Sequence, residues 1–314
     1  MGFEPAYRQL LESGELGRRA QEAWRHLENC DLCARCCRVN RHVSIEGAVC
    51  RTGERAVAHS FGPHHGEENP LRGWRGSGTI FFSWCNLRCV FCQNWEISQK
   101  GIGREVTSEE IATMMLRLQE QGCHNINFVS PSHVVAQIIA AVHVAAQGGL
   151  RLPLVYNTGG YDSIEALQLL DGIIDVYMPD VKYADSDAAF KHSKAKGYVE
   201  FNRAAVREMH RQVGDLVLDE RGIARRGLLV RHLVLPGNLA GTEKVLEFLS
   251  NEISVDTYLN LMDQYRPCYR ADEYPPLDRP VSRAEYLEAL RLCDQYRLQR
   301  LDQRPRGLGW LFSE

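Results

Sequence analysis

Short apolar runs alternate with amphipathic stretches between residues 78 and 263. The apolar runs predict strands at 79–84, 125–130, 154–158, 175–181, 228–236 and 257–263. The stretches between them predict helices at 108–122, 132–147, 163–170, 187–197, 202–214 and 241–253. Strands that alternate with helices form a parallel sheet, because parallel neighbours need crossover connections. Six units are fewer than the eight of a closed barrel, so we expect an α/β fold with a partial (β/α)6 barrel and a site at the strands' carboxyl ends.

The flanking regions follow a different pattern. Residues 7–27 predict a helix, and residues 61–78 are so rich in Gly, Pro and His that we expect an ordered loop. A small hairpin is expected within 216–230, and a last amphipathic helix over 282–298. We therefore expect a cysteine-rich helical segment and loop at 1–77, the barrel at 78–265, and a lid loop with a helix at 266–314.

Charge and composition narrow the classes of partner. The formal net charge is −3, so no basic surface indicates a nucleic acid or an anionic membrane. No apolar stretch is long enough to span a bilayer, and the first residues lack the apolar core of a signal peptide. We expect a cytoplasmic protein without a membrane or nucleic-acid partner.

The eleven cysteines are unusual for such a chain, and seven of them form two compact groups. In a reducing cytoplasm such groups indicate metal or redox chemistry rather than disulfides. Cys293 is expected in the core, and Cys123, at the end of a helix, is expected to be structural. Cys268 lies in a stretch that is either a substrate lid or a connecting loop.

The first compact group stands at the end of the predicted strand 79–84. Cys85, Cys89 and Cys92 are spaced C-x3-C-x2-C. A closed zinc site needs four ligands, whereas three thiolates on a [4Fe–4S] cluster leave one iron open. The triad therefore predicts a [4Fe–4S] cluster whose open iron faces the barrel mouth and binds a reacting ligand.

The second group comprises Cys30, Cys33, Cys37 and Cys50, spaced C-x2-C-x3-C-x12-C, with Cys36 as an extra thiol. The segment has little apolar content, so it would scarcely fold without a metal. Four thiolates suit structural zinc, which the spacing slightly favours. An auxiliary iron–sulfur cluster is the alternative, and the spacing leaves both open.

The segment "CNLRCVFC", with Phe91 before the third cysteine, resembles the signature of the radical S-adenosylmethionine (SAM) superfamily. The flanking "GSGTIFFSWCN" and "QNWEIS" are similar to the branch of pyruvate formate-lyase activating enzymes. The resemblance implies that the open iron binds the amino and carboxylate groups of SAM. Reduction then releases a 5′-deoxyadenosyl radical, which abstracts hydrogen from a substrate. It also implies a flavodoxin- or ferredoxin-type electron donor.

The same resemblance implies contacts to SAM. Phe91 would lie near the adenine, and Asn94 would brace the loop. Asn157 in "YNTGGYD" takes the position of an acidic residue that contacts SAM in activating enzymes. Asp180 and Lys182 in "MPDVKYAD" resemble an Asp-x-Lys pair, and strand alternation turns both to one face. The ordinary alternatives are turn residues for Asn157 and Asp180 and a solvated lysine for Lys182.

Two further positions are less direct. The family's second-strand Gly-Gly-Glu is replaced by "NFVSPSHV", so Ser130 or His133 would hold the SAM amino group, unless this segment only begins a helix. His232 in "RHLVLPG" resembles a histidine that contacts the ribose, and a core histidine is the alternative.

The substrate is the most open question. The resemblance implies a glycine Cα in a glycyl-radical enzyme, and the alternatives are another protein, a peptide or a small molecule. The rivals from other classes are a non-catalytic zinc- or cluster-binding module and a protein that only transfers electrons.

Overall fold

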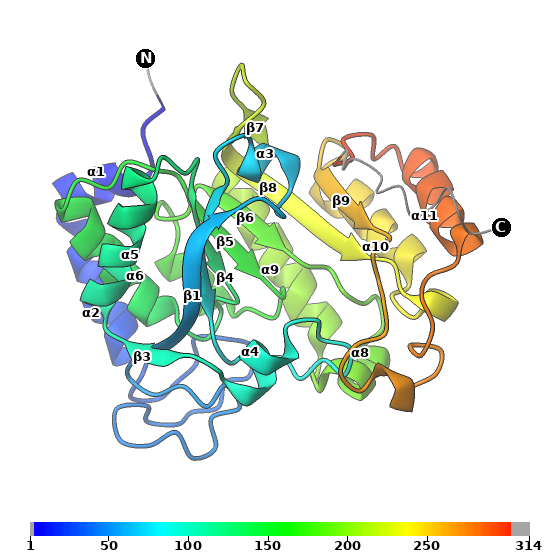
Figure 1. Ribbon diagram of the computed structural model, residues 1–314, viewed down its shortest axis with the longest axis horizontal. Helices are drawn as coiled ribbons and strands as arrows, with labels where there is room; N and C mark the ends of the chain where they lie inside the picture. The colour runs from blue at the N-terminus through cyan, green and yellow to red at the C-terminus, as the bar shows by residue number, and fades with distance from the viewer. Residues whose placement is uncertain (1–2, 303–314) are drawn as a thin grey trace.

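The computed structural model describes residues 3–302 and shows an α/β fold (Figure 1). Six parallel strands lie side by side in chain order, as the sequence predicts: β2 (Ser77–Phe82), β4 (Ile126–Val129), β5 (Leu154–Thr158), β6 (Val176–Pro179), β8 (Ala224–Leu233) and β9 (Tyr258–Met262). The helices that connect them are α4 (Trp95–Lys100), α5 (Ser108–Glu120), α6 (Val135–Gln147), α7 (Ile164–Leu169), α8 (Ser186–Ser193), α9 (Tyr198–Val213) and α10 (Thr242–Phe248). The partial (β/α)6 barrel is therefore confirmed.

The amino-terminal helical segment lies on the outside of the barrel. The predicted helix 7–27 is two helices, α1 (Tyr7–Glu12) and α2 (Glu15–Arg25), because Gly14 has a φ of +77° between them. Figure 1 shows both beside α6. The hydroxyl of Tyr7 donates to the carbonyl of Leu152 at 3.0 Å, which fixes this segment to the barrel.

The segment expected as a loop before the barrel contains a strand. β1 (Ala56–His64) pairs antiparallel with β2 on one side and with β3 (Arg104–Val106) on the other. Pro63 is tolerated because it lies one residue from the end of the strand, where few ladder bonds are lost. β1 thus covers an edge of the parallel sheet that would otherwise expose unpaired backbone groups.

The inner face of the barrel has an apolar layer and a polar layer. Leu71, from the short helix α3 (Asn69–Arg72), packs against Val155, Val176 and Leu229 on the inner face. Alternation along the strands places polar side chains above this layer, nearer the carboxyl ends: Asn127, Asn157, Asp180, Arg231 and Asn260. The polar chemistry of the barrel is therefore collected at one end.

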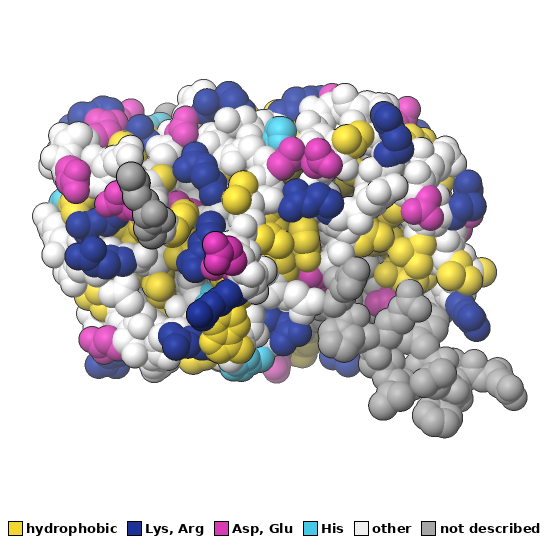
Figure 2. Space-filling model, turned by 90° about the horizontal axis from the view of Figure 1, so that it is seen from above, with side chains coloured by type: hydrophobic (Ala, Val, Ile, Leu, Met, Phe, Trp, Pro, Cys, Tyr) yellow, Lys and Arg dark blue, Asp and Glu magenta, His cyan; other side chains and the backbone are white. Residues whose placement is uncertain are grey.

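The carboxyl-terminal part completes the outer layer. β7 (Val217–Leu218) forms the expected hairpin with β8, and α11 (Arg283–Gln295) is the expected last helix. Single turns lie at Pro236–Asn238 (η1), Leu249–Ile253 (η2) and Ala271–Glu273 (η3). Within residues 3–302, no helix has both the length and the apolar character needed to cross a bilayer. Basic and acidic side chains are interspersed on the face in Figure 2.

Candidate functional site

The three cysteines of the triad lie in the loop that follows β2. The Cys89 side chain is buried, and the other two are half-buried. Each sulfur has a hydrogen-bond donor or hydroxyl beside it: the Leu87 N–H at 3.4 Å from Cys85 Sγ, Ser193 Oγ at 3.0 Å from Cys89 Sγ, and Ser98 Oγ at 3.1 Å from Cys92 Sγ. Such donors stabilise a thiolate in a largely buried setting.

Burial disfavours the thiolate forms of Cys85 and Cys92, and Lys182 partly opposes this effect. Burial, with the other two sulfurs close by, raises the pKa of the Cys85 thiol to about 12. Lys182 lies within electrostatic reach of all three sulfurs and opposes this effect at Cys85 and Cys92. Three thiolates fit a [4Fe–4S] cluster, in which each thiolate binds a different iron.

A charged network occupies the polar end of the barrel beside the triad. Lys182 Nζ donates to Asp180 Oδ2 at 2.5 Å, and Arg231 Nε donates to Asp180 Oδ1 at 2.7 Å. Arg231 also donates through Nη2 to Asn157 Oδ1 at 2.7 Å. Burial alone would raise the pKa of the Asp180 carboxyl, but Arg231 and Lys182 together hold it below its usual value. The three residues from the sequence analysis thus meet, and Arg231 joins them.

His232 points away from this network. Its Nδ1 lies 2.6 Å from the carbonyl oxygen of Val181, which can only accept, so Nδ1 carries the proton. Nε2 then accepts from Thr242 Oγ1 at 3.0 Å. Burial lowers the pKa of His232 to about 4. The expectation of a ribose contact is corrected here: strand alternation gives the inward position to Arg231, and both nitrogens of His232 already have protein partners.

The two candidate residues after β4, Ser130 and His133, lie in different parts of the structure. Ser130 has a φ of +60° and its N–H donates to the carbonyl of Asn157 at 3.0 Å, so it stays at the barrel mouth. His133 is buried and donates through Nε2 to the carbonyl of Ser83 at 3.0 Å. His133 also lines a cavity with the amino-terminal cysteine group. Ser130 therefore remains the candidate for the SAM amino group, and His133 belongs to another site.

The loop after β9 lies over the triad loop. The N–H of Arg270 donates to the carbonyl of Val90 at 2.9 Å. The Phe91 ring is buried and meets the Tyr265 ring edge-on at 5.9 Å, while Trp95 stacks on Tyr269 at 5.2 Å. This loop is therefore in the position expected of a lid.

Asn94 lies at the other end of the triad loop. Its side chain is exposed and makes no capping hydrogen bond to α4. Its backbone takes the bracing role, because the carbonyl accepts from the Ser98 N–H at 2.9 Å and the N–H donates to Cys92 Sγ.

Comparison with known proteins decides the family. Residues 79–249 match the family model described as the Radical SAM superfamily, which is more than half of the chain. The chain belongs to the radical SAM superfamily. Members of this superfamily bind a [4Fe–4S] cluster and SAM, and the triad is the part of this chain that fits the cluster.

Two proteins similar in sequence to this radical SAM protein are named as uncharacterised, and one solved structure similar in fold is named as a methyltransferase. It is 32% identical over 279 residues to "Uncharacterized protein MJ0674" of Methanocaldococcus jannaschii, covering 86% of this chain and 76% of that protein. It is 25% identical over 202 residues to "Uncharacterized protein MJ0808" of the same organism, covering 61% of this chain and 54% of that protein. A solved radical SAM methyltransferase from Sphaerobacter thermophilus aligns with a TM-score of 0.47 at 14% identity, over 69% of this chain and 64% of that one.

Several residues of the radical SAM barrel were missed by sequence reasoning. Asn127 on β4 is fully buried, and among residues 3–302 neither of its side-chain amide atoms has a partner. Glu68 is also buried and accepts from Asn260 Nδ2 at 2.6 Å, so the segment before the barrel is no solvated loop. Arg231 and Asn127 could have been found by applying strand alternation to the predicted strands.

The amino-terminal cysteines converge on one cavity. Cys30, Cys33 and Cys50 are buried, and Cys37 is half-buried, whereas Cys36 is exposed. Burial, reinforced by the neighbouring Cys50 sulfur, raises the pKa of the Cys33 thiol. These four residues thus line one space, and the metal that the sequence predicts for them stays a prediction.

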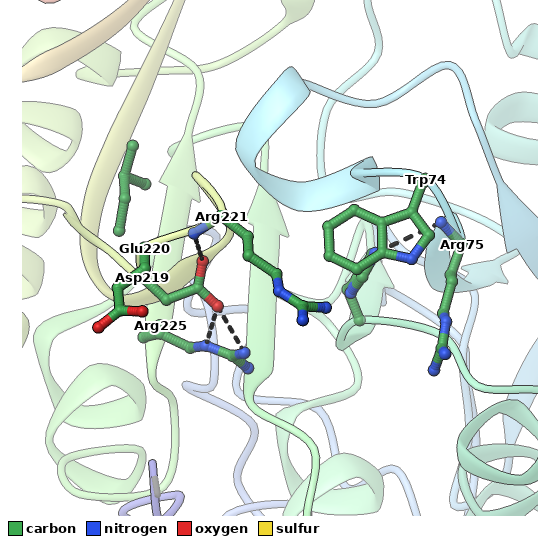
Figure 3. Close-up of a pocket in the computed structure, with 8 residues that line it drawn as sticks. Trp74, Arg75, Asp219, Glu220, Arg221 and Arg225 are labelled. Atoms are coloured by element: carbon green, nitrogen blue, oxygen red, sulfur yellow. Dashed lines mark hydrogen bonds and ion pairs between the residues drawn. The ribbon is translucent and has the colours of Figure 1, made fainter.

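A larger pocket, of about 560 Å³, lies at the opposite end of the radical SAM barrel (Figure 3). It is lined by residues that precede β2, β4 and β8, including Trp74, His124 and Arg221. Arg225 is paired there with Asp219 at 2.7 Å. The amino ends of parallel strands carry stability rather than catalysis in barrels, so the size of this pocket does not make it the site.

Proposed function

We propose that this chain cleaves SAM reductively and uses the resulting radical to abstract hydrogen from a substrate. The observation that carries the proposal is the position of Lys182, which follows β6 and lies within electrostatic reach of the three sulfurs of the triad. When bound, the cluster supplies the electron for this cleavage, as the family implies. The chain's own residues bind SAM, orient it and exclude water.

Lys182 and Asp180 have different roles in this proposal. The Lys182 ammonium has three donors, and one of them is used on Asp180. The other two suit the carboxylate of SAM, since charge-assisted hydrogen bonds are the strong ones. Asp180 already accepts from Lys182 and Arg231, so it positions these cations. Ser130 is our candidate for the amino group of SAM.

The lid keeps water from the reacting atoms. Phe91 lies between the rings of Tyr183 and Tyr265, and the loop of Arg270 is held to the triad loop by a backbone hydrogen bond. Close aromatic packing of this kind keeps water away from the reacting atoms.

For the substrate, we propose the Cα of a glycine in a glycyl-radical enzyme, with a flavodoxin or ferredoxin as electron donor. The support is the likeness of "GSGTIFFSWCN", "QNWEIS" and the Asp180–Lys182 pair to activating enzymes. The alternative is radical modification of another protein, a peptide or a small molecule.

Anaerobic reconstitution tests the core of the proposal. Reduced with dithionite, the full chain should convert SAM to 5′-deoxyadenosine and methionine, and the Cys36→Ala variant should match it. A binding module or a pure electron carrier would give no 5′-deoxyadenosine, and this outcome from a cluster-loaded protein would overturn the proposal.

A second experiment tests the substrate. A candidate glycyl-radical enzyme with deuterated glycine should acquire a glycyl radical signal, and deuterium should appear in 5′-deoxyadenosine. If SAM is cleaved but no deuterium is transferred, the glycyl substrate is wrong and the SAM chemistry stands.

A further inference from the structure

The cysteines of the amino-terminal group line one common cavity. Cys30, Cys33, Cys37 and Cys50 line one small, partly open space together with the exposed Cys36. Cys33 lies within electrostatic reach of the other three sulfurs. Residues 28–52 contain no helix or strand. Three of the four thiols are buried all the same, although no regular secondary structure holds them in place.

Two buried polar side chains line this cavity. Arg41, 2% exposed, has Nη1 at 3.6 Å from Cys30 Sγ, and it also donates to the backbone carbonyls of Thr52 and His133 at 2.8 Å. His133 is 1% exposed, and its Nδ1 has no partner within residues 3–302. Because Nε2 of His133 donates to the Ser83 carbonyl, its open Nδ1 is an acceptor. The buried Arg41 cation beside Cys30 is therefore the group that favours an anionic, thiolate-bound metal group in this cavity.

Zinc and a [4Fe–4S] cluster both accept four thiolates, and they differ in what they can do. Zinc has no redox chemistry, whereas a [4Fe–4S] cluster carries electrons. The position of this cavity relative to the triad therefore bears on which of the two it suits.

The cavity is joined to the triad loop at two points. The carbonyl of Tyr161 accepts from the Ala34 N–H at 3.4 Å and from Asn86 Nδ2 at 2.6 Å, which ties the residue after Cys33 to the residue after Cys85. Arg88 donates to the carbonyl of Val49 and, at 3.4 Å, to that of Cys85. The two cysteine groups are thus neighbours in space, although the sequence separates them by 34 residues between Cys50 and Cys85.

We propose that Cys30, Cys33, Cys37 and Cys50 hold a second [4Fe–4S] cluster next to the triad. Four thiolates occupy all four irons, so this cluster has no open position for SAM and is confined to a structural or electron-transfer role. The proposal does not depend on the substrate of the enzyme or on its ability to cleave SAM.

Metal content tests the proposal directly. Reconstituted anaerobically, the full chain should contain about eight irons and eight sulfides. The Cys85→Ala/Cys89→Ala/Cys92→Ala variant should keep about four of each, with no SAM cleavage. The Cys36→Ala variant is the matched control and should equal the unaltered chain.

Metal analysis of the native chain distinguishes a cluster from zinc. Purified without added metal, it should contain iron and no stoichiometric zinc. About four irons with one tightly held zinc would overturn the proposal, as would a triad variant that retains no iron after folding is verified by circular dichroism.

Electron paramagnetic resonance of the native chain tests the second cluster without relying on the stability of a variant. When both clusters of the native chain are reduced, their electron paramagnetic resonance signals should be broadened by magnetic coupling between neighbours. The triad variant should show one uncoupled [4Fe–4S] signal. Two uncoupled signals in the native chain would overturn the adjacency, and a single signal would overturn the second cluster.

Discussion

The two cysteine groups lie in neighbouring loops but have different surroundings. The triad loop follows a barrel strand and faces Lys182, Asp180 and Arg231, so charged groups are gathered where a ligand would bind. The amino-terminal group lies outside the barrel and is enclosed by Arg41 and His133. A site that performs chemistry needs an incomplete ligand set with polar groups beside it, whereas a closed site needs a complete set in a packed shell.

The largest expected effect is the loss of SAM cleavage when a cysteine of the triad is replaced. Cys89→Ala removes a ligand of the reactive cluster, so SAM cleavage should fall to the background of the cluster-free protein. Cys36→Ala, in the other group, should leave the rate unchanged. The measurement is 5′-deoxyadenosine formed per protein, and equal rates for Cys89→Ala and the native chain would contradict the assignment.

Next in size is the loss of Arg231. Arg231→Met leaves the buried Asp180 carboxylate with one partner instead of two, which should lower the free energy of unfolding by about 3 kcal/mol. Anaerobic denaturant unfolding measures this change. The exposed Arg104, replaced by Met, is the control and should change stability by less than about 0.5 kcal/mol.

The network beside the triad should also decide SAM affinity. Lys182→Met removes a charge-assisted hydrogen bond worth about 1.5–3 kcal/mol, so the Kd for SAM should rise roughly 10- to 100-fold. Equilibrium dialysis on the cluster-loaded protein measures it. Lys182→Arg keeps the charge and should recover part of the affinity, and an unchanged Kd in both variants would exclude the contact.

His232, on the outward face of β8, should make the stability of the protein depend on pH. The pKa of His232 is about 4 in the fold and about 6.5 when unfolded. The unfolded chain therefore binds the extra proton between these values, so His232 costs stability as the pH falls through 6.5. From pH 7 to pH 5 the native chain should lose about 2 kcal/mol more than His232→Asn. Parallel unfolding curves of the two proteins at both pH values measure this, and equal losses would contradict it.

The smallest effect concerns the link between the two cysteine groups. Arg88→Met removes the hydrogen bonds to the carbonyls of Val49 and Cys85, and we expect a loss of about 1 kcal/mol. Hydrogen exchange should rise at residues 47–52 and in the triad loop together. A change confined to one loop would show that Arg88 does not couple them. Arg38→Met, at an exposed position in the same region, is the control.

Much of the fold was predictable because it depends on short-range patterns. The six parallel strands and the last helix agree with apolar periodicity, and Thr107 and Ser282 cap α5 and α11 as such residues usually do. Strand β1 was missed because Gly and Pro near its end resemble a loop, and its stability comes from pairing with β2 and β3, which are distant in sequence.

The candidate site was predictable in part. The triad, Asn157, Asp180 and Lys182 were found from motifs, and the structure brings the last three together through Arg231. His232 and Arg231 are adjacent in sequence and point to opposite sides of one strand, so choosing between them needed the direction of the barrel interior.

By itself the sequence determined the spacing of the cysteines, the alternation of strands with helices, and thereby the family, because these features depend on residues a few positions apart. Only the tertiary structure decided that the two cysteine groups are neighbours, that His133 faces the amino-terminal group, and that Arg231 completes the charged network. The reason is that contacts between distant segments depend on how the strands pack and which way each side chain turns, and no local pattern specifies either.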